Sequence, residues 1–128
     1  MSPHHESPFA RAGGTREIFV WTYNGRAAIL AVRGEIDLYN QPHFSAELNK
    51  TQDASVIVID LTQCRYLDGS ALHALERARK ALAIPLHIVI DDRSQLRRLF
   101  EITQLHRKLR IFSTVRAALA DMLFKETR

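Results

Sequence analysis

The sequence has a single cysteine and no long hydrophobic run, and both shortages limit what the protein can be. Cys64 stands alone among 128 residues, which excludes a disulfide within the chain and a metal site built from several cysteines. The apolar runs are much shorter than the ~20 residues that cross a bilayer. The first residues also lack the apolar core of a signal peptide. We therefore expect a cytoplasmic protein without a membrane span.

Glycine is scarce, and the sequence motifs of enzymes are missing. The five glycines form no phosphate-binding loop, and no serine stands in the Gly-x-Ser-x-Gly pattern of hydrolases. His43, His87 and His106 are too scattered for a metal site. His73 falls on the polar side of an expected helix, away from a nucleophile. The sequence therefore predicts a protein that is not an enzyme and that uses neither a cofactor nor a metal ion.

Length and hydrophobic content fit one folded domain. A chain of 128 residues with 46% hydrophobic residues suits one core and leaves no room for a second domain. Residues 1–15 contain Pro3, Pro8 and the pair Gly13-Gly14, which favours a poorly ordered leader. The folded domain is then expected over residues 16–128.

Hydrophobic periodicity predicts strands that alternate with helices after an opening hairpin. Residues 56–59 are all β-branched, as in a strand covered on both faces, and residues 68–82 carry apolar side chains at helical spacing. Asn24-Gly25 is a favoured turn between the first two strands. The expected strands are 17–23, 27–33, 56–59, 86–90 and 110–112, and the expected helices begin near Pro42, Asp68 or Gly69, Ser94, and Ser113 or Thr114.

This order predicts an α/β domain with a mixed sheet. Strands that alternate with helices need crossover connections, so the later strands should be parallel, after an antiparallel opening pair. About four helices should pack on the sheet. Residues 60–67 are expected to form a short loop, and the third helix should bury Leu96, Leu99 and Phe100 while Arg97 and Arg98 face solvent.

Ser70 lies in the first turn of the helix that follows the central strand. Free backbone N–H groups and the positive end of the helix dipole stabilise an anion there, so a phosphate on Ser70 would be tolerated. Phosphorylation would add about −1.5 to −2 charges, enough to abolish contact with an acidic or apolar partner surface. The alternative is that Ser70 only caps the helix or faces solvent, which is the commoner role of serine at a helix start.

Two aspartates stand at the ends of loops next to strands, and the expected topology can bring both to the sheet edge where Ser70 lies. Asp68 either only caps the helix or also orients the Ser70 hydroxyl and accepts its proton. Asp37 either shapes the same surface or only bonds to its own backbone in a turn. Asp60, which ends the buried run, is expected to be structural.

Four motifs occur in an order that resembles a known family. The longest is Tyr66-Leu67-Asp68-Gly69-Ser70-Ala71-Leu72, after a strand ending in Asp60-Leu61. The others are Gly34-Glu35-Ile36-Asp37 as a turn after the second strand, Arg98-Leu99-Phe100-Glu101-Ile102-Thr103, and Ile111-Phe112 followed by Ala117-Ala118-Leu119. Together they resemble the STAS domains of bacterial anti-sigma factor antagonists over roughly residues 17–124.

The resemblance implies a STAS-like fold and a role in partner switching. Such a protein binds an anti-sigma factor that is also a serine kinase of the GHKL ATPase type, and phosphorylation ends the binding. A PP2C-type phosphatase would reverse the modification. Ser70 matches the usual phosphoacceptor of the family, and the resemblance places Asp37, Asp68, Gly69, Ala71 and His73 in the partner-binding surface.

The chain departs from the family pattern at three positions. Gly69 replaces the first of two serines, Ala71 replaces the glycine after Ser70, and Gln104 stands where a glycine is frequent. The Ala71 methyl group is expected to narrow the approach of a kinase to Ser70 or to reduce backbone flexibility.

Residues 93–110 hold six basic side chains and one acidic one, a local excess that accounts for the net charge of +4. A basic face suits an acidic protein, anionic lipid headgroups or nucleic acid, although many such faces are simply solvated. Direct nucleic acid binding is not expected, because no aromatic cluster lies between these residues. The alternative function is a non-phosphorylated STAS-like accessory subunit of a membrane lipid transport complex, whose ATPase this face would meet.

Overall fold

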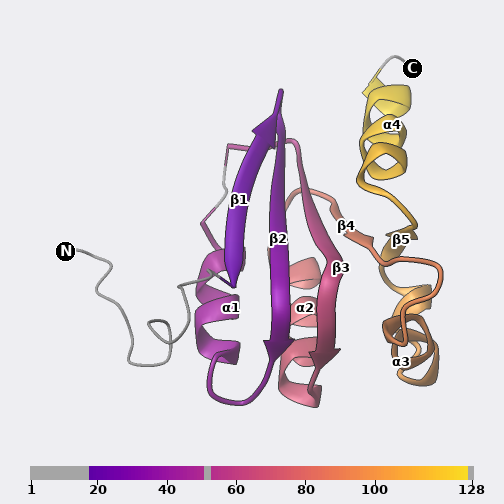
Figure 1. Ribbon diagram of the computed structural model, residues 1–128. Coiled ribbons are helices and arrows are strands. Elements are labelled where there is room, and N and C mark those ends of the chain that lie inside the picture. The colour runs from indigo at the N-terminus through magenta and orange to yellow at the C-terminus, as the bar shows by residue number, and fades with distance from the viewer. Residues whose placement is uncertain (1–17, 51–52, 127–128) are drawn as a thin grey trace, which may run out of the picture.

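The structure of the protein is a computed structural model that describes residues 18–50 and 53–126 (Figure 1). The expected leader of residues 1–15 lies outside the described residues. The strands are β1 (Phe19–Asn24), β2 (Ala27–Ile36), β3 (Val56–Leu67), β4 (Leu86–Val89) and β5 (Arg110–Phe112). The helices are α1 (Gln41–Leu48), α2 (Gly69–Ala81), α3 (Leu96–Ile102) and α4 (Val115–Glu126), with a 3₁₀ helix, η2 (Leu105–Arg107), after α3.

The strands form one mixed sheet in the order β1-β2-β3-β4-β5. β1 and β2 are antiparallel, and each later pair is parallel, which confirms the predicted fold class. The hairpin loop is Gly25-Arg26, one residue later than predicted, because Asn24 pairs with Ala27. Gly25 has a φ of +60°, as the first central residue of a type II′ turn requires.

The sheet is covered by helices on both faces. α1, α2 and α3 share the larger core cluster with alternate residues of the strands, including Leu30, Ile57 and Ile59. α4 packs on the opposite face, where Ala118 meets Val58 in a smaller cluster. Figure 1 shows α1 and α2 behind the first three strands and α4 beside β5. Within the described residues, no helix is both long and apolar enough to cross a membrane.

β2 and β3 are longer than predicted, and their extensions pair with each other up to Ile36 and Leu67. The expected loop over residues 60–67 is therefore strand, and Gly34-Glu35-Ile36 lies in β2 instead of a turn. Two register shifts interrupt this pairing, as β-bulges do. The shifts explain why the alternation of buried and exposed residues, on which strand prediction depends, is lost in this part of β3.

A buried carboxylate ties α1 to the edge strand β1. Glu47 accepts hydrogen bonds from Trp21 Nε1 at 2.6 Å and from Lys50 Nζ at 3.0 Å, and it lies 3.1 Å from His43 Nε2. Burial by itself raises the pKa of Glu47, but the bonds from Lys50, Trp21 and His43 outweigh burial and hold the pKa below its usual value. Glu47 therefore stays charged and fixes α1 against the sheet.

Residues at the starts of α3 and α4 act as caps, with one departure from the prediction. Ser94 Oγ accepts the backbone N–H of Leu96, and Thr114 Oγ1 accepts that of Ala117.

Arg97 does not simply face solvent, contrary to the prediction. Its guanidinium donates to the Ile90 carbonyl and forms an ion pair of 3.2 Å with Asp92, because these groups lie in the loop just before α3.

Gln104, between α3 and η2, has a left-handed backbone with a φ of 67°. Side chains other than glycine rarely adopt this conformation, since the Cβ atom crowds the carbonyl oxygen. This strain means that a glycine, which the resemblance to the family leads one to expect here, would fit the backbone better than Gln104 does.

Candidate functional site

Asp37 and Asp68 leave the sheet at the same edge. β2 and β3 are parallel and end as the pair Ile36 and Leu67, and the N–H of Asp68 donates to the Ile36 carbonyl at 3.0 Å. The carboxyl ends of the two strands therefore bring both aspartates beside the start of α2. The topology expected from the sequence thus places them together.

Asp68 caps α2 and also holds the Ser70 hydroxyl. Its Oδ1 atom accepts the backbone N–H of Ala71 at 3.1 Å and the hydroxyl proton of Ser70 at 2.6 Å. A bond of this length between a hydroxyl and a carboxylate is short and charge-assisted. Asp68 therefore both caps the helix and orients the Ser70 hydroxyl, so the two interpretations of this residue hold together.

The residues next to Ser70 differ in how far their side chains are exposed to a partner. Gly69 and His73 are exposed, and a Cβ atom on Gly69 would meet no atom within 4 Å. Ala71 is 0% exposed and belongs to the core beneath α2. The expectation that its methyl group narrows the approach to Ser70 is therefore wrong, and its side chain cannot touch a partner. Ala71 contributes its backbone N–H to the Asp68 cap.

Asp37 organises the turn between β2 and α1. Its Oδ1 atom accepts the N–H groups of Tyr39 and Asn40 at 3.0 and 3.1 Å, and Asn40 Oδ1 accepts the N–H of Asp37 at 2.8 Å. This is the self-bonded turn aspartate that the sequence left as one alternative. Because the turn is held from within, Asp37 shapes the surface by fixing the backbone of the residues between it and Asn40.

That turn presents large apolar side chains to solvent. Leu38 is 69% and Tyr39 is 92% exposed, and Tyr66, at the end of β3, is 50% exposed. Tyr66 pairs in register with Glu35, two residues before Asp37, so the three side chains surround the same sheet edge. We call Leu38, Tyr39, Tyr66 and Ser70 the Ser70 edge. Grouped exposed apolar residues of this kind mark interaction sites.

Sequence reasoning did not identify the surface role of Leu38, Tyr39 and Tyr66. A signal was available for two of them, because Leu38-Tyr39 stands between two residues typical of turns, Asp37 and Asn40. Large apolar residues inside a turn have no core to enter. Tyr66 offered no such signal, since it lies in a strand whose alternation is interrupted.

Cys64 lies inside β3, in the segment that was expected to be a loop, and it is 5% exposed. Burial raises the pKa of its thiol to about 11, and the thiol donates to the Tyr66 carbonyl. Such a cysteine stays protonated at neutral pH and is a poor nucleophile. In the part of the chain that the structure describes, no group of three or more His, Cys, Asp or Glu side chains could hold a metal ion.

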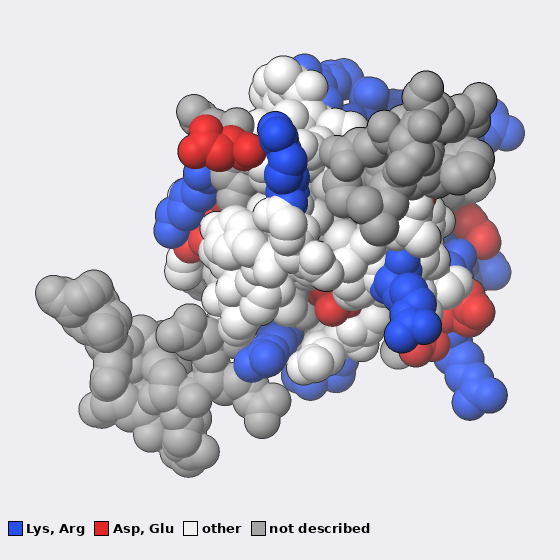
Figure 2. Space-filling model, turned by 90° about the horizontal axis from the view of Figure 1, so that it is seen from above, with Lys and Arg blue, Asp and Glu red and all other residues white. Residues whose placement is uncertain are grey.

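Half of the basic residues between Arg93 and Arg110 form ion pairs within the chain. Arg97 pairs with Asp92, Lys108 with Glu76 at 2.7 Å, and Arg110 with Asp121 at 3.0 Å. On the face shown in Figure 2, Lys and Arg side chains are spread over separate places, and several lie next to Asp or Glu. The basic excess of this segment is thus partly neutralised within the chain.

Comparison with known families agrees with this architecture. The family model described as STAS domain matches residues 20–118, which include the whole sheet edge around Ser70. The chain belongs to the STAS domain family. A search of curated proteins found no match.

Solved structures with the same fold include anti-sigma factor antagonists. One from Mycobacterium paratuberculosis is 20% identical, with a TM-score of 0.74 over 80% of this chain and 91% of the other. A putative anti-sigma factor antagonist from Thermotoga maritima is 19% identical, with a TM-score of 0.70 over 80% and 92%. The Bacillus cell fate determinant SpoIIAA in its phosphorylated form is 15% identical, with a TM-score of 0.57 over 81% and 98%.

Proposed function

We propose that this STAS domain is an anti-sigma factor antagonist that works by partner switching. Unphosphorylated, it binds an anti-sigma factor that is also a serine kinase of the GHKL ATPase type, and this binding releases the sigma factor. Phosphorylation of Ser70 ends the binding, and a PP2C-type phosphatase restores it. The observation that carries the proposal is the Ser70 hydroxyl held 2.6 Å from Asp68 beside exposed apolar side chains.

The bond to Asp68 prepares Ser70 to accept a phosphoryl group. In the transfer, Ser70 Oγ forms a bond to the γ-phosphorus of ATP while the bond from that phosphorus to the β-phosphate oxygen breaks. The hydroxyl proton has to leave, and Asp68 Oδ1 already accepts it. The kinase supplies ATP and the metal ion. Asp68 is thus a positioning group that can also take the proton.

The phosphate would make the Ser70 edge, which already lies beside the Asp68 carboxylate, strongly anionic. It adds about −1.5 to −2 charges within one side-chain length of the Asp68 carboxylate. The Ser70 hydroxyl bond to Asp68 is lost, because the oxygen no longer carries a proton. A partner surface that had covered Leu38, Tyr39 and Tyr66 would then have to bury the charge, which costs several kcal/mol when it is unpaired.

The test uses the anti-sigma factors of the GHKL ATPase type encoded in the same genome, each purified and mixed with the full chain and Mg-ATP. We expect one of them to bind and to transfer a single phosphate, located at Ser70 by mass spectrometry of peptides. Ser70→Ala should bind and stay unmodified, whereas Ser94→Ala, the control, should still be modified. Phosphate on the Ser70→Ala protein would refute the site assignment.

A further inference from the structure

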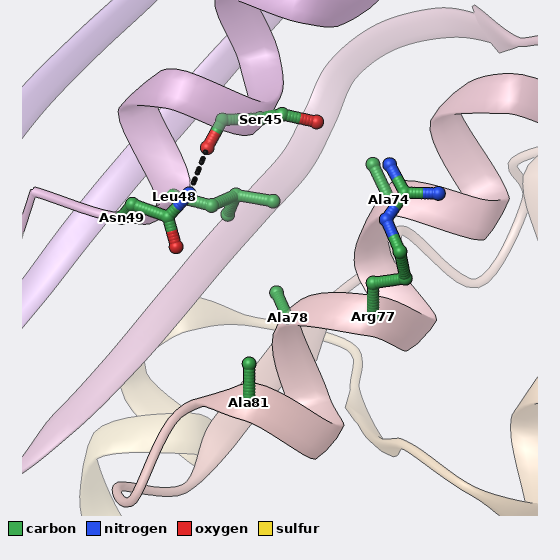
Figure 3. A pocket seen from close by; sticks show the side chains of 7 residues that line it. All are labelled: Ser45, Leu48, Asn49, Ala74, Arg77, Ala78 and Ala81. Carbon is green, nitrogen blue, oxygen red and sulfur yellow. Dashed lines mark hydrogen bonds between the residues drawn. The ribbon is translucent and has the colours of Figure 1, made fainter.

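A groove of about 240 Å³ runs between α1 and α2 on the helical face of the domain (Figure 3). The methyl groups of three alanines point from α2 toward α1, and Leu48 points back from α1. Small side chains on α2 leave the space between the helices unfilled. The groove is lined by Ser45, Leu48, Asn49, Ala74, Arg77, Ala78 and Ala81.

The groove continues the surface that begins at Ser70. Ala74, Arg77 and Ala81 follow Ser70 by four, seven and eleven residues in α2, and this spacing places all four on one helix face. At 1.5 Å per residue, the face extends about 16 Å from Ser70 to Ala81. α1 also starts at the Ser70 edge, directly after the Asp37–Asn40 turn. The first groove residue of α2, Ala74, therefore lies one helical turn beyond Ser70.

The groove has an apolar floor and one cationic side chain. Ala74 and Ala78 are buried, whereas Arg77 and Ala81 are exposed. No ion pair of Arg77 occurs among the residues that the structure describes, although the nearby Glu76 is paired with Lys80 and Lys108. The polar wall on α1 is already bonded, since Asn49 Nδ2 donates to the Ser45 carbonyl at 3.1 Å. Solvent satisfies the Arg77 donors in the free protein, and a carboxylate of a partner can take over these hydrogen bonds.

We propose that this groove receives a segment of the anti-sigma factor that carries an aliphatic side chain and a carboxylate. The aliphatic side chain covers the alanine floor and Leu48, and the carboxylate pairs with Arg77. This is the groove-filling mode by which proteins often bind a partner helix. The proposal rests on the proposed function, because it extends the Ser70 edge to a second contact of the same partner.

The groove also gives phosphorylation a second means of weakening the complex. Arg77 lies seven residues from Ser70, about 10 Å along the helix. That distance slightly exceeds the Debye length of about 8 Å at physiological ionic strength, so a phosphate on Ser70 would repel a carboxylate bound there only weakly. Repulsion along the groove would add a small amount to the larger cost at the Ser70 edge.

The test measures the affinity of purified anti-sigma factors from the same genome for paired variants by titration calorimetry. Ala81→Trp fills the groove, and Arg77→Glu reverses its charge. Each should weaken binding about tenfold or more, since both act at the desolvated part of an interface. Ala120→Trp and Arg116→Glu make the same changes at exposed positions of α4 and should leave affinity within about twofold.

The outcomes separate this proposal from the proposed function. Circular dichroism first establishes that all four variants fold. If one anti-sigma factor binds the wild type and both groove variants bind as tightly as their controls, the groove proposal is wrong and the proposed function stands. If no anti-sigma factor binds the wild type, both are wrong.

Discussion

Two helices of this domain begin with an aspartate and a serine but use them in opposite ways. At the start of α2, Asp68 accepts the N–H of Ala71, and Ser70 donates its hydroxyl to the same carboxylate. At the start of α3, Ser94 itself accepts the N–H of Leu96, while Asp91 serves the turn before it. Where the aspartate caps the helix, the serine hydroxyl is left available for chemistry.

The side chains around Ser70 and Ser94 also differ. Ser70 lies at an edge with exposed Leu38, Tyr39 and Tyr66, none of which carries a charge. Ser94 stands beside residues with charged side chains, and the Asp92–Arg97 ion pair is close to it in the chain. A phosphate on Ser70 would therefore add charge next to the Asp68 carboxylate and beside exposed apolar side chains, whereas a phosphate on Ser94 would add charge beside the Asp92–Arg97 ion pair.

The largest expected difference between the two sites is in partner binding. Ser70→Glu should weaken binding to the anti-sigma factor by about 100-fold, because a buried unpaired charge costs about 2–4 kcal/mol. Ser94→Glu should change affinity by less than about twofold, as for a surface position outside the contact. Titration calorimetry with both variants measures the two affinities, and equal losses would contradict the assignment of the contact surface to Ser70 and not to Ser94.

The two aspartates should differ in their contribution to stability. Asp68→Ala removes the cap of α2 and should lower the free energy of unfolding by about 1–2 kcal/mol. Asp91 makes one exposed hydrogen bond, to the N–H of Arg93, so Asp91→Ala should cost about 0.5 kcal/mol. Urea denaturation of both variants measures the difference. A smaller loss for Asp68→Ala than for Asp91→Ala would contradict the capping role of Asp68.

For the two serines, we expect substitution at α3 to cost more stability than substitution at α2, the reverse of the order for the aspartates. Ser94→Ala leaves the N–H of Leu96 without its acceptor and should cost about 1 kcal/mol. Ser70→Ala keeps the cap, and water can replace the lost hydroxyl at the partly exposed Asp68 carboxylate, so we expect a change below about 0.5 kcal/mol. Thermal unfolding at matched concentration distinguishes them, and a larger loss for Ser70→Ala would show that Ser70 is structural.

The smallest expected effect concerns Gly69. Gly69→Ser adds a Cβ atom that meets no atom of the surrounding structure within 4 Å beyond its chain neighbours and its own helix backbone, and serine is a better helix former than glycine. We expect a gain of about 0.5 kcal/mol and unchanged phosphorylation at Ser70, measured by urea denaturation and by peptide mass spectrometry. Loss of phosphorylation would mean that the approach to Ser70 depends on the missing side chain at position 69.

Much of the fold was predictable because its signals are local. The order of strands and helices, the Asp68 cap and the place of Ser70 in the first turn all follow from residue types within a few positions of each other. The limits of β2 and β3 were not predictable, because the extensions to Ile36 and Leu67 exist only as a pair, and two register shifts interrupt their periodicity.

Residue types and their spacing were enough to predict the family, the alternation of strands and helices, and a serine at the start of a helix. The side chains that surround this serine are known only from the folded structure. The exposure of Leu38, Tyr39 and Tyr66, the burial of Ala71 and the groove between α1 and α2 depend on contacts between segments far apart in the chain. Periodicity predicts which residues share a face of a helix or strand. Whether that face is buried or exposed depends on packing against segments that are distant in the chain.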